Sequence, residues 1–257
     1  MNGERGHFET TGRELQFGRW VNRNGIKRFL LDLDDTICVT RPIFRGAMKE
    51  ATEIIAAHSS IMTQEQWMEV LDRIDGGLFE VYGVNANRWN ITIETLAKKY
   101  GLYRHIQKKA KQILQNIYTT PLKMLDGAEE GLDFIKRVGV PMGIVTHANV
   151  EWTLKKFAWL NLKRYVSWDD IFVVDENGHK SSESWAQAVR KFGLTPIECA
   201  VVGDSPRSDI NPACEIGVRH CFMVDNSNRW TIHNQPVDQK AMVIKAINEI
   251  AEAALGR

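Results

Sequence analysis

The sequence predicts an α/β protein with a parallel sheet, because two kinds of segment alternate along it. Short apolar runs, such as Phe-Leu-Leu at residues 29–31 and Ala-Val-Val at residues 200–202, alternate along the chain with segments of helical spacing. Strands that alternate with helices in this way form parallel sheets joined by right-handed crossovers. Ligands of such sheets bind beyond the carboxyl ends of the strands, so the residues that follow each strand are the first candidates for a functional site.

Length and charge narrow the classes of function. The 257 residues are enough for one core domain plus an insert, and the formal net charge of +1 argues against a broad nucleic-acid surface. No apolar run is long enough to span a bilayer, so neither nucleic acid nor membrane is an expected partner. The four cysteines (Cys38, Cys199, Cys214 and Cys221) lack paired zinc spacing and indicate reduced thiols in a cytoplasmic protein.

The first part of the chain predicts an N-terminal extension followed by the first core strand. Residues 1–25 are polar and charged and contain no signal-peptide segment. Phe17, Trp20 and Val21 could dock this extension onto the core, and a disordered leader is the alternative. Residues 26–34 are predicted to form the first strand.

The chain then changes character, and residues 42–118 are predicted to form a helical module inserted after the first strand. Helical spacing dominates this stretch, and glycines separate the periodic segments. The expected core domain therefore comprises residues 26–41 and 119–257. Within the insert, helices are predicted at residues 44–58, 64–74, 89–100 and 103–118.

After the insert, the sequence returns to alternating strands and helices. Strands are predicted at residues 141–146, 171–174, 199–203 and 220–224, and helices at residues 127–138, 149–160, 182–192 and 208–217. A last helix is predicted at residues 237–255, because its apolar residues fall on one stripe.

The end of the first strand is strongly acidic. Asp32 and Asp34 would point the same way if the strand stays regular, because side chains alternate with a period of two. Two such carboxylates repel each other and need a cation, a hydrogen-bond network or a catalytic reason to be there. Asp35 is predicted to be a turn or cap residue.

Other strand ends carry matching chemistry. Thr146 and His147 close the second strand, and Asp204 ends the strand at residues 199–203. Asp209 follows on the next loop or helix start, and Lys180 directly precedes a predicted helix. Hydroxyl, amine and acid groups at several crossover points of an otherwise apolar sheet predict one shared site.

The combined order of these motifs resembles the haloacid dehalogenase-like superfamily, in its phosphatase branch. The motifs are Asp-x-Asp-x-Thr, a threonine after an apolar strand, a lysine, and Gly-Asp-x-x-x-x-Asp, and the resemblance covers residues 26–226. It implies a Rossmann-like three-layer α/β/α sandwich with a parallel sheet. It also implies that the helical insert is a C1-type cap, a mobile helical bundle over the strand ends.

The resemblance also implies roles for individual residues. Asp32 would be the nucleophile and Asp34 the general acid and base, while Thr146 and Lys180 would contact the phosphoryl group. The family's lysine motif usually reads Lys-Pro-x-Pro, whereas residues 180–183 read Lys-Ser-Ser-Glu, so Lys191 is kept as the next candidate. The implied Mg²⁺ would be held by Asp32, Asp34, Asp204 and Asp209.

Three further residues are candidates for substrate binding. Thr36 would help to order the loop after the nucleophile. His147 could line the site, with a polar turn residue as the alternative. Arg45 could reach a substrate from the hinge of the insert, with a surface ion pair as the alternative.

The chemistry of these groups agrees with the implied reaction. A carboxylate can attack phosphorus to form an aspartyl-phosphate that water then hydrolyses, provided that a cation and fixed donors stabilise the phosphoryl oxygens. An acid at Asp34 can protonate a leaving oxygen and then activate water, which favours phosphate esters. Family members that displace halide from carbon, or that cleave phosphonates, lack this acid.

We therefore expect a magnesium-dependent phosphatase that acts on a small phosphorylated metabolite, such as a sugar phosphate, a nucleotide or a phosphoglycolate-like compound. A helical lid favours small substrates. A phosphomutase is the alternative enzyme, and a non-catalytic binding or regulatory protein on the same scaffold is the third interpretation. A homodimer is left open.

Overall fold

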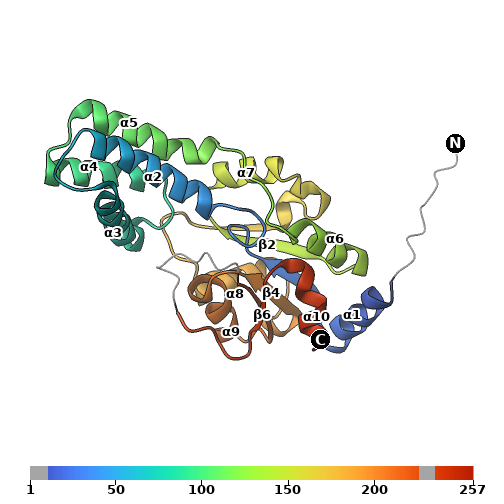
Figure 1. The fold of residues 1–257 in the computed structure, drawn as a ribbon. Coiled ribbons are helices and arrows are strands. Elements are labelled where there is room, and N and C mark those ends of the chain that lie inside the picture. Colours follow the sequence, from blue (N-terminus) through green and yellow to red (C-terminus); the bar gives the residue numbers. More distant parts are fainter. Residues whose placement is uncertain (1–10, 226–234, 257) are drawn as a thin grey trace, which may run out of the picture.

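The computed structural model describes residues 11–225 and 235–256 and confirms the α/β class (Figure 1). Six strands form one sheet in the order β3-β2-β1-β4-β5-β6, and every neighbouring pair is parallel. The strands are β1 (Arg28–Leu31), β2 (Met142–His147), β3 (Ile171–Val174), β4 (Cys199–Gly203), β5 (His220–Val224) and β6 (Met242–Ile244).

Ten α-helices are found in the described ranges, and none of them is long and apolar enough to cross a membrane. The first five are α1 (Gly12–Arg23), α2 (Arg41–Ala57), α3 (Gln64–Tyr82), α4 (Arg88–Tyr100) and α5 (Arg104–Gln115). The others are α6 (Ala128–Val138), α7 (Val150–Trp159), α8 (Ser182–Lys191), α9 (Asn211–Glu215) and α10 (Ile250–Leu255). Short helical turns include η1 (Asn116–Thr119), η3 (Trp168–Asp170), η5 (Pro206–Ile210) and η7 (Ile247–Glu249).

The sheet is buried on both faces, which explains why β1 and β4 are almost purely apolar. Phe29 and Leu31 point to one face, where they join a core completed by α1, α6, α7 and α10. Leu30 and Val201 point to the other face, against α8 and α9. The structure is therefore the expected three-layer sandwich, with β1 between β2 and β4 at its centre.

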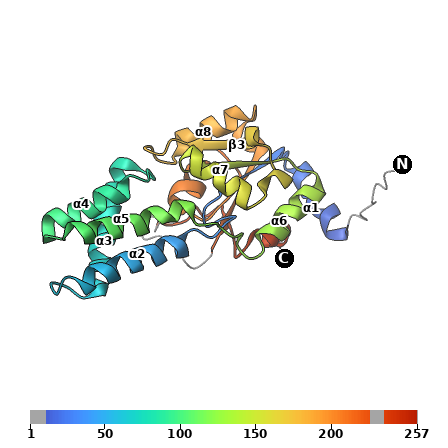
Figure 2. The same cartoon turned by 90° about the horizontal axis from the view of Figure 1, so that it is seen from above.

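Helices α2 to α5 form a separate bundle at one end of the molecule (Figure 2). The bundle lies between β1 and α6 in the chain, and it has its own buried side chains, among them Ile55, Trp67, Ile93 and Ala110. These apolar positions recur at helical spacing, so packing between helices accounts for them.

The prediction of one helix over residues 237–255 was wrong. Met242–Ile244 forms strand β6, which pairs with β5, and only the turn η7 and the short helix α10 follow. The apolar residues of this segment fit a helical stripe, but Val243 and Ile244 are β-branched and extend the edge of the sheet.

The N-terminal extension docks onto the core through α1. Thr11 and Glu14 form a capping box that begins this helix. Phe17 is fully buried and contacts the rings of Phe29 and Phe134, and Val21 is also buried. Residues 1–10, for which a disordered leader was the alternative, lie outside the described residues.

We predict that Phe17→Ala lowers the free energy of unfolding by about 3–5 kcal/mol, because it removes a buried ring between α1 and the sheet. Urea denaturation measures this change. Leu15→Ala on the same helix is the matched control, since Leu15 is 53% exposed. A loss in the Phe17 variant no larger than that in the Leu15 variant would show that α1 does not contribute to the core.

Candidate active site

The segment after β1 forms a tight loop that a carboxylate holds in place. Asp35 has a positive φ of 56°, a conformation that aspartate tolerates better than most residues. Its side chain accepts hydrogen bonds from the backbone N–H groups of Thr40 and Arg41, each at 2.9 Å, and from the Thr40 hydroxyl at 2.8 Å. Asp35 therefore fixes the start of α2, in agreement with its prediction as a turn residue.

Lys180 is the cation at the centre of the site. Its Nζ lies 2.6 Å from Asp32 Oδ1 and 2.5 Å from Asp209 Oδ1, and all three side chains are buried. Burial acts to lower the pKa of Lys180, but the charges of Asp209 and Asp32 outweigh it and raise this pKa above its usual value. The ammonium group therefore stays charged between two carboxylates.

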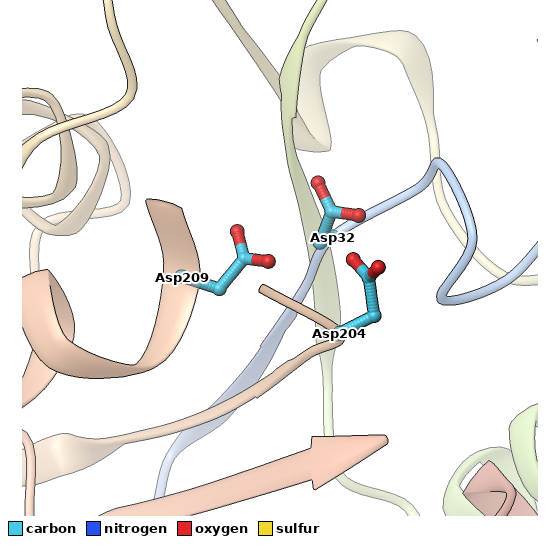
Figure 3. A group of neighbouring side chains, drawn as sticks. All are labelled: Asp32, Asp204 and Asp209. Carbon is cyan, nitrogen blue, oxygen red and sulfur yellow. The ribbon is translucent and has the colours of Figure 1, made fainter. Parts of the chain in front are cut away.

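Asp32, Asp204 and Asp209 converge at the ends of β1 and β4 (Figure 3). One oxygen from each lies within 4.8 Å of the others. Burial raises the pKa of Asp204, and the neighbouring charges of Asp209 and Asp32 raise it further. Three crowded carboxylates are the donor set that Mg²⁺ prefers, and a divalent cation would relieve their repulsion.

A glycine and a threonine bring these acids together. A Cβ on Gly203 would lie 2.7 Å from Asp209 Oδ2 and still closer to the Asp209 Cβ, so only glycine lets the two segments approach. The Thr36 hydroxyl donates to Asp32 Oδ2 at 3.0 Å and lies 3.4 Å from Asp204 Oδ1. Thr36 thus links the acids that follow two neighbouring strands.

The end of β2 contributes two polar groups with unused hydrogen-bonding capacity. Thr146 is fully buried, and its Oγ1 has no hydrogen-bond partner within residues 11–225 and 235–256. The Nε2 atom of His147 is likewise buried without a partner there. Leu31 pairs with Ile144 in the sheet, so these residues reach the same edge as Asp32. His147 also lines the cavity described below and is suited to contact a ligand, whereas Thr146 and Thr36 are not among the residues that line that cavity.

Asp34 has a partner that the sequence did not reveal. Both of its carboxylate oxygens lie 2.6 Å from Nζ of Lys156, which projects from α7 and is fully buried. Lysine in an amphipathic helix is normally solvated, so the spacing alone gave no reason to single it out. The one available signal is that Lys156 follows Trp152 by four residues, on the face of α7 that turns inward.

A cavity of about 140 Å³ joins these residues to the helical bundle. Asp32, Asp34, His147, Lys180, Asp204 and Asp209 line its polar end. The rest of its lining is largely aromatic, with Phe79, Tyr118 and Trp152, and it includes the ion pair of Asp75 and Arg88 at 2.7 Å. Phe79, a buried residue of α3, therefore also lines this cavity.

The end of α3 docks against the core beside the cavity. Glu80 forms a two-pronged ion pair with Arg207 of η5, at 2.9 and 3.0 Å. The Val84 N–H donates to the carbonyl of Glu176 at 2.8 Å, and Asn85 Nδ2 donates to Asn177 Oδ1 at 2.8 Å. These contacts hold the helical bundle against the carboxyl edge of the sheet.

Two candidates from the sequence lie elsewhere. Arg45 pairs with Asp72 at 2.5 Å within the bundle and is not among the residues that line the cavity. This contact corresponds to the ion pair that was its alternative interpretation. Lys191 donates to the carbonyl of Ile171 at 2.5 Å, so Lys180 is the lysine that the structure places with the acids.

The sequence is similar to those of known hydrolases. The model of a hydrolase family, described as haloacid dehalogenase-like hydrolase, matches residues 26–217. A glyceraldehyde 3-phosphate phosphatase of Pyrococcus furiosus is 26% identical over 199 residues, which cover 76% of this chain and 79% of the relative. A phosphorylated carbohydrates phosphatase of Thermotoga maritima is 22% identical over 201 residues, covering 77% of this chain and 85% of the relative.

A solved structure is similar over most of the chain. The haloacid dehalogenase-like family hydrolase of Xanthomonas campestris superimposes with a TM-score of 0.73 at 16% identity. The match covers 90% of this chain and 91% of that protein. At this identity, the likeness supports the fold.

We predict that His147 makes stability depend on pH. Burial, reinforced by the positive charges of Lys180 and His179, lowers the pKa of His147 to about 4. The unfolded chain takes up a proton near pH 6.5 while the folded protein does not, so stability is full above about pH 6.5 and falls as the pH drops toward 4. The contribution lost between pH 7 and pH 5 is about 2 kcal/mol.

Urea denaturation at the two pH values tests this expectation. His147→Asn should lose about 2 kcal/mol less than the wild-type protein between pH 7 and pH 5. His58→Asn, at an exposed position, is the control and should follow the wild-type pH dependence. An unchanged pH dependence in the His147 variant would contradict the burial argument.

Proposed function

Because the chain belongs to the haloacid dehalogenase-like hydrolases, we propose that this hydrolase is a magnesium-dependent phosphatase of a small phosphorylated metabolite. The observation that carries the proposal is the joint position of Asp32, Lys180, Asp204 and Asp209 in one cavity. It is supported by relatives that are named as phosphatases of glyceraldehyde 3-phosphate and of phosphorylated carbohydrates.

The three converging acids suit a magnesium ion. Asp32, Asp204 and Asp209 would hold it; Asp34, which the sequence also named as a ligand, is not in this group, and its carboxylate pairs with Lys156. When bound, Mg²⁺ would offset the negative charge of the phosphoryl oxygens and of the acids themselves.

Asp32 is the proposed nucleophile. Lys180 and Thr36 fix the orientation of its carboxylate by contacting one oxygen each, at 2.6 and 3.0 Å. A carboxylate oxygen forms a bond to phosphorus, and the bond from phosphorus to the ester oxygen breaks, which leaves an aspartyl-phosphate. The Thr146 hydroxyl would donate to a phosphoryl oxygen, and Lys180 would balance its charge.

Asp34 is the proposed general acid and base. It would give a proton to the departing ester oxygen in the first step. It would then take a proton from the water that attacks phosphorus and releases inorganic phosphate. Its position in the lining of the cavity, together with aromatic side chains, fits a group that meets the leaving part of the substrate.

The cavity indicates a short leaving group. Its volume of about 140 Å³ is close to that of an engineered cavity of about 150 Å³ that binds benzene. A sugar phosphate of a few carbon atoms suits this space better than a nucleoside monophosphate. Asp75 and Arg88 neutralise each other in the lining of the cavity, which favours an uncharged leaving group over one that carries a carboxylate.

A panel of substrates tests the function directly. Purified protein with Mg²⁺ is incubated with glyceraldehyde 3-phosphate, glucose 6-phosphate, phosphoglycolate and AMP, and inorganic phosphate is measured. Release from the short sugar phosphate above all others is expected. An isomerised sugar phosphate without phosphate release would instead show a phosphomutase, and no turnover of any ester would favour the non-catalytic interpretation.

We predict that Asp32→Asn lowers kcat by about 10⁴-fold or more, because the amide cannot act as the nucleophile. Phosphate release and circular dichroism measure activity and fold. Asp169→Asn, an exposed change of the same type, is the control and should retain activity. Turnover at the wild-type rate by the folded Asp32 variant would refute the assignment.

We predict that Asp204→Asn weakens magnesium binding, since it removes one of three charged ligands. Titration calorimetry with MgCl₂ on the unliganded protein should show at least a tenfold weaker Kd, on the order of 1.4 kcal/mol. EDTA should abolish the phosphatase activity of the wild-type protein. Equal Mg²⁺ affinity in the variant and the wild type would place the ion elsewhere.

A further inference from the structure

We propose that Lys156 is a positioning residue that fixes the carboxylate of Asp34 for proton exchange with the leaving oxygen. The inference rests on the proposed phosphatase function and adds a residue to it. Lys156 lies far from the acidic motifs in the sequence, and it is joined to the site by one ion pair, in which both oxygens of Asp34 lie 2.6 Å from its Nζ.

The buried surroundings of Lys156 make a charged side chain at this position costly. Its side chain is fully buried, and burying an ammonium group costs several kcal/mol unless it is paired. Within the described parts of the chain, Asp34 is its one salt-bridge partner. An aliphatic side chain would fill the same space on α7 without this cost.

Lys155, the neighbour of Lys156 on α7, has the usual environment of a charged side chain. Lys155 is partly exposed and pairs with Glu151 at 2.7 Å on the outer surface of the helix. Lys156 faces inward with Trp152 and Thr153, which are also buried. The two lysines are adjacent in the chain, so their different surroundings make Lys155 a matched control.

The ammonium group of Lys156 contacts both an aromatic ring and a carboxylate. Its Nζ lies 3.4 Å from the centre of the Trp152 ring, a cation–π contact, and Trp152 itself lines the cavity. The Asp34 carboxylate, whose side chain is 25% exposed, is the second partner of this Nζ and also lines the cavity. Ring, ammonium and carboxylate therefore form a fixed series at the cavity wall.

Fixing Asp34 matters most for esters that need a proton to leave. An alkoxide is a poor leaving group and departs with a proton from Asp34, whereas p-nitrophenolate departs without one. General acid catalysis contributes about 10²–10⁴-fold, and this gain depends on the position of the acid. Loss of Lys156 should therefore slow formation of the aspartyl-phosphate from alkyl phosphates far more than from p-nitrophenyl phosphate.

The experiment compares Lys156→Met with the wild-type protein and with Lys155→Met on two substrates. These are p-nitrophenyl phosphate and the alkyl phosphate of the panel above that the wild-type protein hydrolyses fastest. For Lys156→Met we expect kcat/KM on the alkyl phosphate, which reports the step in which the ester oxygen leaves, to fall by about 30-fold or more. On p-nitrophenyl phosphate kcat/KM should fall by less than about threefold. The later attack of water on the aspartyl-phosphate is common to both substrates and affects kcat alone. Lys155→Met should match the wild-type protein on both.

A purely structural role gives a different result. An equal loss of kcat/KM on the two substrates, or no loss on either, would overturn the proposal. Lys156→Arg keeps the cation and should recover part of the activity on the alkyl phosphate. A wild-type protein that hydrolyses no phosphate ester would overturn the proposed function itself, and with it this inference, so the two failures are distinguishable.

A second comparison holds even if Lys156→Met does not fold. Asp34→Asn removes the anion, and the double variant Asp34→Asn with Lys156→Met then leaves no unpaired charge in this contact. If Lys156 acts through Asp34, the double variant should hydrolyse the alkyl phosphate as slowly as Asp34→Asn alone. A further loss of tenfold or more in the double variant would show that Lys156 acts on its own account and would overturn the proposal.

Discussion

The ammonium group of Lys180, held between Asp32 and Asp209, is the interaction on which the rest of the site depends. The two carboxylates come from segments that follow different strands, and Lys180 directly precedes α8. Without this cation, buried like charges would face each other at the end of β1. Removing one partner from a buried ion pair costs about 3–5 kcal/mol, so the same contact that orients the proposed nucleophile also keeps these segments together.

The sequence predicted the fold because its signals are local. The alternation of apolar runs with helical segments gives the parallel sheet, and the acids after β1 and β4 mark its functional edge. Residues 237–255 were wrongly predicted to form one helix, because a short edge strand and a helical stripe can share the same apolar spacing. Pairing of Met242–Ile244 with β5, a contact with a distant part of the chain, decides between them.

Site residues could be predicted where the residue type itself implies a chemical role. They were harder to predict where the role depends on whether the side chain is buried. Asp32, Lys180, Asp204 and Asp209 stand out in the sequence, and the structure brings them together. By contrast, Lys155 and Lys156 are the same amino acid, and only tertiary packing makes the first solvated and the second buried. The Asp75–Arg88 pair at the cavity wall was missed for the same reason, since its two members look like ordinary surface charges of a helical bundle.

The contact of Gly203 with Asp209 has a consequence for how this protein can evolve. Every other amino acid carries a Cβ, and here a Cβ would collide with the side chain of Asp209. Any missense change in the codon for residue 203 therefore shifts one of the acids that surround the proposed magnesium ion. Substitutions at residue 203 are therefore not expected to be neutral, although glycine itself contributes no functional group to the reaction.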